Sequence, residues 1–153
     1  MSVIVRSEDV ALAIVERLLT IRIANGYETD IGRDVQQGRR KVPADDEPPC
    51  VQLVEGNDEI QDSTAKRTVI KIAQPYVIDA FDVCDPVNPN TQAHKMIRDI
   101  KRAFFGANAD PLRVRLYELN YLGKDIGPRP DGAGFVQARV MIEVVFAEDL
   151  SAP

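Results

Sequence analysis

The chain has 153 residues, of which 44% are hydrophobic and 28% charged, with a formal net charge of -5. This length fits one domain, residues 1–153, and is too short for a second sizeable core. The mildly acidic balance argues against a protein that coats nucleic acid, and no apolar stretch approaches the roughly 20 residues needed to span a bilayer. The N-terminus lacks the apolar run of a signal peptide, so we expect a soluble protein made in a reducing cytoplasm, with Cys50 and Cys84 as free thiols.

The stretch from Ser7 toward Asn25-Gly26 shows the spacing of an amphipathic helix. Ser7 is placed to cap it, and Glu8 and Asp9 suit the positive end of its dipole. Its apolar positions recur at three and four residues, and Asn25-Gly26 supplies a stop signal. The apolar stripe predicts a helix that packs on a sheet, and it comprises Val10, Ala11, Ile14, Val15, Leu18 and Leu19.

A long loop-bearing hairpin is expected between Tyr27 and Glu55. Tyr27, Thr29 and Ile31 alternate with polar residues, and CVQLVE at 50–55 is extended in character. The intervening VQQGRRKVPADDEPP loses all periodicity and predicts a long mobile loop, a kind of segment that is usually functional or disordered when it occurs in a small domain. The loop carries a basic triplet and an acidic triplet, which are Arg39, Arg40, Lys41 and Asp45, Asp46, Glu47.

The segment TVIKIAQPYVIDAFDV, residues 68–83, predicts a strand long enough to cross a whole sheet. Pro75 cannot donate to a ladder, so the strand should lie at an edge there or be divided by a bulge. Both of its faces are apolar, which indicates covering helices or a subunit interface. The polar residues 57–66 before it are expected to form only a connection.

A second helix should begin after Asn88, with Pro89 in its first turn, and end at Gly106. Its core stripe has helical spacing and consists of Ala93, Ile97, Ile100 and Phe104. Lys95, Arg98 and Arg102 share another face, which is either a solvated surface or a contact surface for a partner or DNA.

The C-terminal third predicts two strands. LRVRLYELNYLG, residues 112–123, alternates with a change of phase near Glu118 that suggests a bulge, and GKDIGPRPDGAG reads as a loop. GFVQARVMIEVVF, residues 134–146, is the most regular alternation in the chain and predicts the central strand. We therefore expect an α+β domain with an antiparallel or mixed sheet of about four to five strands, two main helices and the loop-bearing hairpin. The expected core face of the central strand is Val136, Ala138, Val140, Ile142, Val144 and Phe146.

The sequence shows no P-loop, GxSxG, HExxH or GxGxxG pattern. His94 has no partner at a metal-ligand spacing and is expected to be exposed. Asp45, Asp46 and Glu47 suit Mg²⁺ or Ca²⁺ chemically, but adjacent residues rarely converge on one ion without more distant ligands. We expect no catalytic, metal or cofactor site, and a small metal-dependent hydrolase is the less favoured alternative.

The order of these elements resembles one protein family. ANGYETDIGRDVQQGRR, PPCVQLVEG, HKMIRDIKRAFF and YLGKDIGPRPDGAGFVQARVMIEVVFAEDLSAP together are similar to the tail terminator, or tail completion, proteins of long-tailed bacteriophages. The likeness covers nearly the whole chain, although the family has no diagnostic motif. It implies a small α+β, non-enzymatic assembly protein that forms a hexameric ring on the head-proximal end of the tail tube.

By this resemblance the partners are other copies of the chain, the tail tube protein and the head-tail connector, and the location is the virion. DNA would pass through the ring without specific binding, which an acidic protein suits. A closed ring needs two different complementary patches on each subunit. The mixed-charge loop from Arg39 to Glu47 and the basic face of Lys95, Arg98 and Arg102 are our candidates. Another phage neck component, such as a head completion protein or connector adaptor, is the nearest alternative.

Overall fold

The computed structural model describes residues 4–38, 41–62, 68–107, 109, 111–127 and 134–153, and it confirms the α+β class. Two helices accompany a mixed sheet with the order β1-β2-β4-β6-β5, and β3 pairs with β4 beyond the end of β2. In the described part of the chain, no helix is long and apolar enough to cross a membrane. The elements are α1 (Ser7–Leu19), η1 (Ile23–Asn25), η2 (Ile31–Arg33), β1 (Val35–Gln37), β2 (Cys50–Glu55), β3 (Glu59–Asp62), β4 (Val69–Val83), α2 (Pro89–Phe105), β5 (Glu118–Ile126) and β6 (Phe135–Asp149).

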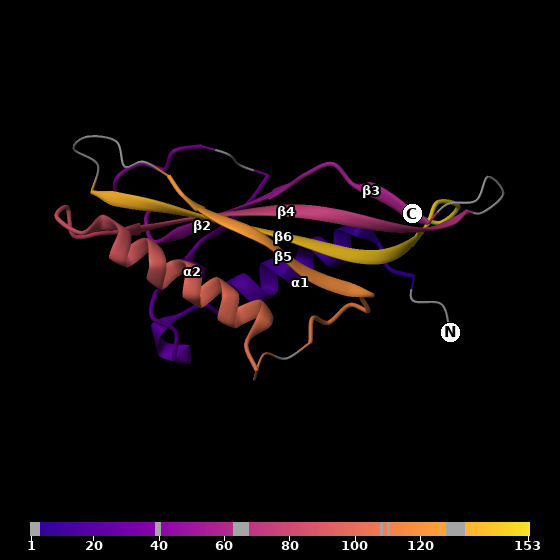
Figure 1. Cartoon of the computed structure of the whole chain (residues 1–153), viewed down its shortest axis with the longest axis horizontal. Helices are drawn as coiled ribbons and strands as arrows, with labels where there is room; N and C mark the ends of the chain where they lie inside the picture. The colour runs from indigo at the N-terminus through magenta and orange to yellow at the C-terminus, as the bar shows by residue number, and fades with distance from the viewer. Residues whose placement is uncertain (1–3, 39–40, 63–67, 108, 110, 128–133) are drawn as a thin grey trace.

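The antiparallel pair β4 and β6 forms the centre of the sheet. Their register runs over fifteen residue pairs, from Val69 opposite Asp149 to Val83 opposite Phe135. The prediction of a central strand is confirmed, because β6 lies between β4 and β5 and each of the six residues of its expected core face is at most 1% exposed. Figure 1 shows α1 and α2 on one side of the strands, whereas the chain between β1 and β2 crosses the other side. We call this other side the outer sheet face.

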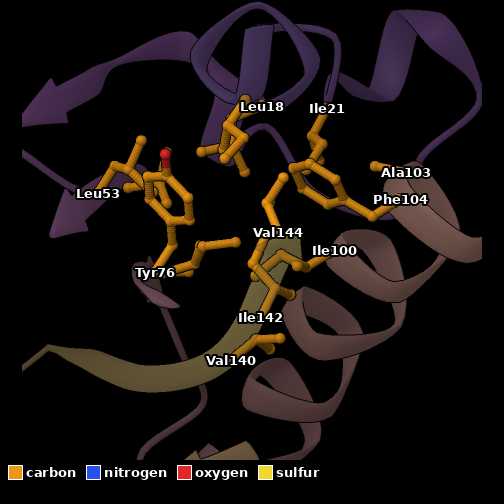
Figure 2. Close-up of a cluster of buried hydrophobic side chains, with 14 of the residues drawn as sticks. Leu18, Ile21, Leu53, Tyr76, Ile100, Ala103, Phe104, Val140, Ile142 and Val144 are labelled. Carbon is orange, nitrogen blue, oxygen red and sulfur yellow. The ribbon is translucent and has the colours of Figure 1, made fainter. Parts of the chain in front are cut away.

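The main core lies between the sheet and the two helices. Figure 2 shows Val140, Ile142 and Val144 of β6 facing Ile100 and Phe104 of α2, with residues of α1 and β2 closing the layer. All four residues of the predicted α2 stripe are buried. Since each large apolar side chain contributes about 1.5–3 kcal/mol on burial, this layer supplies the main gross driving force for folding.

The N-terminal segments differ from the sequence prediction in their boundaries. Arg6 rather than Ser7 is the N-cap of α1, and the helix ends at Leu19. Gly26 adopts a left-handed conformation with φ 89°, but it closes the short turn η1 instead of α1. The predicted strand at residues 27–31 is wrong, because backbone and side-chain contacts to α2, described below, hold this segment in an irregular path.

The predicted hairpin between Tyr27 and Glu55 is also wrong. β1 begins only at Val35 and pairs with β2 in parallel, with Val35 opposite Val51. Parallel neighbours cannot be joined by a tight hairpin, so the chain after β1 must return along the sheet before β2 can start. The long aperiodic stretch is this return connection.

Pro75 sits in the middle of β4 without interrupting its ladder with β6. The carbonyl of Pro75 accepts a hydrogen bond from the backbone N–H of Gly56 at 2.9 Å. β2 ends opposite Tyr76 and β3 begins opposite Ala73, so Pro75 faces the junction between these two strands. The predicted local edge is therefore present, but β4 remains undivided. The polar stretch that we expected to be only a connection contains β3, which adds a sixth strand.

The segment before β5 alternates as predicted but forms no ladder. β5 begins at Glu118, and the inward-pointing Leu112, Val114 and Leu116 pack against the main core instead. The irregularity expected near Glu118 lies between Tyr121 and Gly123. The predicted loop at 123–134 starts later, because residues 123–126 belong to β5, and residues 128–133 lie outside the described ones.

Tyr76 provides a test of the core. Its side chain is fully buried beside Leu53, and within the described part of the chain its hydroxyl has no hydrogen-bond partner (Figure 2). Burial also raises the pKa of this hydroxyl. Tyr76→Phe should leave the free energy of unfolding unchanged or raise it by about 1 kcal/mol, because it removes a desolvated, unpaired group. Urea unfolding measures this, with exposed Tyr121→Phe as the control, and a loss of stability confined to Tyr76→Phe would contradict it.

Candidate assembly surfaces

The connection between β1 and β2 is anchored on the outer sheet face. The side chain of Gln52 is 1% exposed; its oxygen accepts from the Lys41 backbone N–H at 3.1 Å, and its amide donates to the Lys41 carbonyl at 2.7 Å. Pro43 and Pro48 are buried on either side of a turn that is closed by the Glu47 N–H and the Ala44 carbonyl, 3.0 Å apart. This part of the predicted loop thus contacts the sheet through Gln52 and two buried prolines, whereas Arg39 and Arg40 lie outside the described residues.

The turn of residues 44–47, called the acidic turn below, projects from these anchors. Asp45 and Asp46 are exposed at its tip, and Glu47 is half-buried. The Glu47 carbonyl accepts a hydrogen bond from Arg33 at 3.5 Å. Val42, just before the turn, is 65% exposed, so the turn presents two carboxylates beside one apolar side chain.

A polar cluster lies next to this connection. Asp79 of β4 is 1% exposed, and Arg139 of β6 donates to it at 2.7 Å while Gln137 donates at 3.2 Å. The bond to Asp79 raises the pKa of Arg139. Lys41 and Val42 help to line a shallow cavity of about 200 Å³ above the cluster. Because these side chains bind one another, the buried Asp79 carboxylate is compensated within the sheet.

The predicted basic face of α2 holds the chain that follows α1. Arg98 contacts both carboxylate oxygens of Glu28, at 2.9 and 3.0 Å, and Arg102 donates to the Gly26 carbonyl at 2.7 Å. The guanidinium of Arg102 lies 4.6 Å from the centre of the Tyr27 ring. Lys95 is half-buried, and Arg98 and Arg102 remain exposed.

Asp99, on the buried side of α2, holds the same segment through hydrogen bonds to residues 28 and 29. This residue of α2 is 1% exposed and accepts from the backbone N–H groups of Glu28 and Thr29, at 3.0 and 2.8 Å, and from the Thr29 hydroxyl at 2.6 Å. Sequence reasoning missed this role. The available signal was a carboxylate between Ile97 and Ile100 in an otherwise apolar stripe, since a buried charge needs partners.

Several carboxyl groups of the described residues have pKa values displaced by their surroundings, among them those of Glu28, Asp30 and Asp82. The hydrogen bond from Arg98 lowers the pKa of Glu28, and the backbone N–H of Ile23 lowers that of Asp30. Burial raises the pKa of Asp82, against the opposing effect of its hydrogen bonds from Gln92 and the Val83 N–H. Asp82 lies at the end of β4 that precedes α2.

A shallow, open groove lies on α2 beside Glu28. Its volume is about 470 Å³, and it is lined by Arg98, Lys101, Arg102, Phe105 and Glu28, with Asp99 and Gly106. The ammonium of Lys101 lies 5.0 Å from the centre of the Tyr121 ring, and Phe105 meets the same ring edge-on with centroids 6.2 Å apart. We call this the α2 groove. The sequence analysis did not single out Lys101, although it follows Arg98 by three residues and so shares its side of the helix.

The two groups of predicted site residues do not form one site. The acidic turn belongs to the connection across the outer sheet face, and Lys95, Arg98 and Arg102 belong to the helix layer on the opposite side (Figure 1). His94 is exposed, Cys50 and Cys84 are free thiols, and no group of three potential metal ligands occurs among the residues that the structure describes. The arrangement is that of two separate, oppositely charged surfaces. No family model and no curated protein matches the chain.

Asp99 should be essential for attachment of the segment after α1. Asp99→Ala leaves the buried N–H and hydroxyl of Thr29 and the partly buried N–H of Glu28 without their acceptor, so the free energy of unfolding should fall by about 3 kcal/mol. Asp99→Asn retains one acceptor oxygen and should lose less. Urea denaturation measures both, with exposed Asp58→Ala as the control. Equal stability of Asp99→Ala and the control would contradict this account.

Asp82 should make the protein less stable as the pH rises. Its pKa in the native state is raised above the ordinary value of 3.8, so the native state binds more protons than the unfolded state between these two pKa values. Stability from this group is full below pH 3.8 and falls as the pH rises through the raised pKa. The unfolding free energy of the wild type minus that of Asp82→Asn should therefore decrease with pH. Denaturation from pH 3.5 to 7.5 measures it, and an increasing difference would contradict the assignment.

Proposed function

We propose that this protein is a ring-forming tail terminator that caps the head-proximal end of a phage tail tube. In this role the ring ends tube polymerisation and offers a surface to the head-tail connector. The proposal rests first on the resemblance in the order of elements. The α+β fold, with one helix before the long central strands and one between them, is compatible with it.

The structural observation that supports the proposal most is the separation of the two charged surfaces. A ring grows by heterologous contacts, in which one patch of a subunit meets a different patch of its neighbour. The connection that carries the exposed Asp45 and Asp46 crosses the outer sheet face, whereas α2, which carries the exposed Arg98 and Arg102, packs on the other face (Figure 1). Two complementary surfaces in this arrangement favour head-to-tail association over a closed two-fold dimer.

The remaining partners follow from the same proposal. The tail tube protein and the connector would meet the two flat sides of the ring, and the product would reside in the virion after synthesis in the bacterial cytoplasm. The net charge of -5 suits a ring through which DNA must move without being held.

Self-association and tail binding test the proposal. Sedimentation over a wide range of concentrations should give a hexamer, and negative-stain images should show a central hole. Added tails should bind the protein at one end, whereas heads alone should not. Binding to heads but not to tails would favour another neck component, and a monomer that binds neither would contradict the proposal.

The basic triplet should contribute to these contacts. Replacing Arg39, Arg40 and Lys41 with alanine should weaken ring or tube binding without lowering the melting temperature, because it removes three positive charges from the mixed-charge loop. Sedimentation and tail binding measure the effect, with Arg113→Ala plus Lys124→Ala as a control on other exposed cations. Assembly equal to that of the control would remove the triplet from the contact surfaces.

A further inference from the structure

The acidic turn has the form of a preformed projection. Its two flanking prolines are buried, and Gln52 binds the Lys41 backbone on the approach to the turn. Asp45 and Asp46 are exposed, and Val42 is 65% exposed next to them. A turn that is fixed before it binds loses little conformational entropy in a contact, so it is suited to insert into a complementary hollow.

The α2 groove has the complementary chemistry. Its lining includes three cations and one exposed carboxylate. The cations are Arg98, Lys101 and Arg102, and the carboxylate is that of Glu28. The side chain of Phe105 lies in the groove and is 38% exposed. The groove therefore offers positive charge next to an exposed apolar side chain.

The cations of the groove are already oriented. Arg98 is held by Glu28, Arg102 by the Gly26 carbonyl and the Tyr27 ring, and Lys101 by its position over the Tyr121 ring. Side chains with fixed positions bind an anionic partner at a lower entropic cost than mobile ones do. An apolar contact within the groove adds selectivity for a partner that carries an apolar residue beside its carboxylates.

We propose that the α2 groove receives the acidic turn of a second copy of this chain, with Asp45 and Asp46 at the cations and Val42 against Phe105. This inference rests on the proposed ring, whose subunit contact it specifies. The match of charge and of apolar character favours this occupant over duplex DNA, whose outermost groups are phosphates and whose bases are stacked inside, and the net charge of -5 also opposes approach to DNA. The surfaces lie on opposite sides of the sheet, so each copy can use both at once (Figure 1).

Charge reversal tests the contact. Asp45→Lys with Asp46→Lys, and separately Arg98→Glu with Lys101→Glu, should each weaken self-association by about tenfold or more, because like charges then meet. Lys101→Glu alone leaves the bonds of Arg98 and Arg102 intact and should give a smaller loss. Melting temperatures establish that each variant folds. Asp58→Lys and Lys124→Glu, which make the same charge changes at exposed sites away from both surfaces, should leave association unchanged.

Mixing the two double variants gives the decisive result. Each type of neighbouring pair then has opposite charges across the contact, so the mixture should recover hexamers that alternate the two variants, which native mass spectrometry identifies by mass. Raising the salt from 50 to 500 mM should weaken the wild-type association because it screens exposed charges.

The outcomes separate this inference from the proposed function. If both double variants still form rings as the wild type does, the proposed contact is overturned while the ring proposal stands. The same holds if the two double variants fold but form no rings when they are mixed. A wild type that stays monomeric with and without tails would overturn both. The groove would instead be assigned to nucleic acid if the wild type binds duplex DNA and Arg98→Glu with Lys101→Glu abolishes that binding without changing self-association.

Discussion

The antiparallel pairing of β4 with β6 is the interaction on which the rest of the structure depends. Fifteen residue pairs align the two strands, so one face carries the apolar positions that α1 and α2 cover. A slip of one residue would turn this apolar set to the other face, and the burial of both helices would be lost. The same ladder fixes Asp79 beside Arg139 on the outer sheet face. Both candidate surfaces therefore take their positions from one ladder.

α2 connects the core to the surface because its inner side packs in the core and its outer side carries exposed cations. The inner side buries its apolar stripe together with Asp99, which holds the segment at Glu28 and Thr29. That segment in turn places the Glu28 carboxylate against Arg98 and the Gly26 carbonyl against Arg102. The orientation of the exposed Arg98 and Arg102 thus depends on the buried carboxylate of Asp99, which follows Arg98 directly and precedes Arg102 by three residues. The two features are coupled, and loss of the Asp99 contacts is expected to disturb the groove as well as the fold.

Elements with one regular periodicity over many residues could be predicted from the sequence. Elements whose conformation depends on their pairing partners could not. β6 and α2 were predictable because Val136 to Phe146 and Ala93 to Phe104 each follow one period. The parallel pairing of β1 with β2 was not, because strand direction is set by partners rather than by local pattern. Likewise, Leu112 to Leu116 alternates to cover the core without joining the sheet. Of the site, the sequence identified the charged residues, but the roles of Asp99, Lys101 and Gln52 depend on tertiary contacts.

The packing of this fold bears directly on the proposed assembly. A head-to-tail contact generates a closed ring only if each copy is rotated by the same fixed angle, and otherwise it produces an open helical filament. That angle depends on how the acidic turn and the α2 groove are oriented within one subunit. The turn is held on β2 through Gln52, the groove is built on α2, and both elements pack on the β4–β6 pair. If the ring forms as proposed, one continuous core between the two candidate surfaces restricts variation in the angle and so favours one ring size over a mixture.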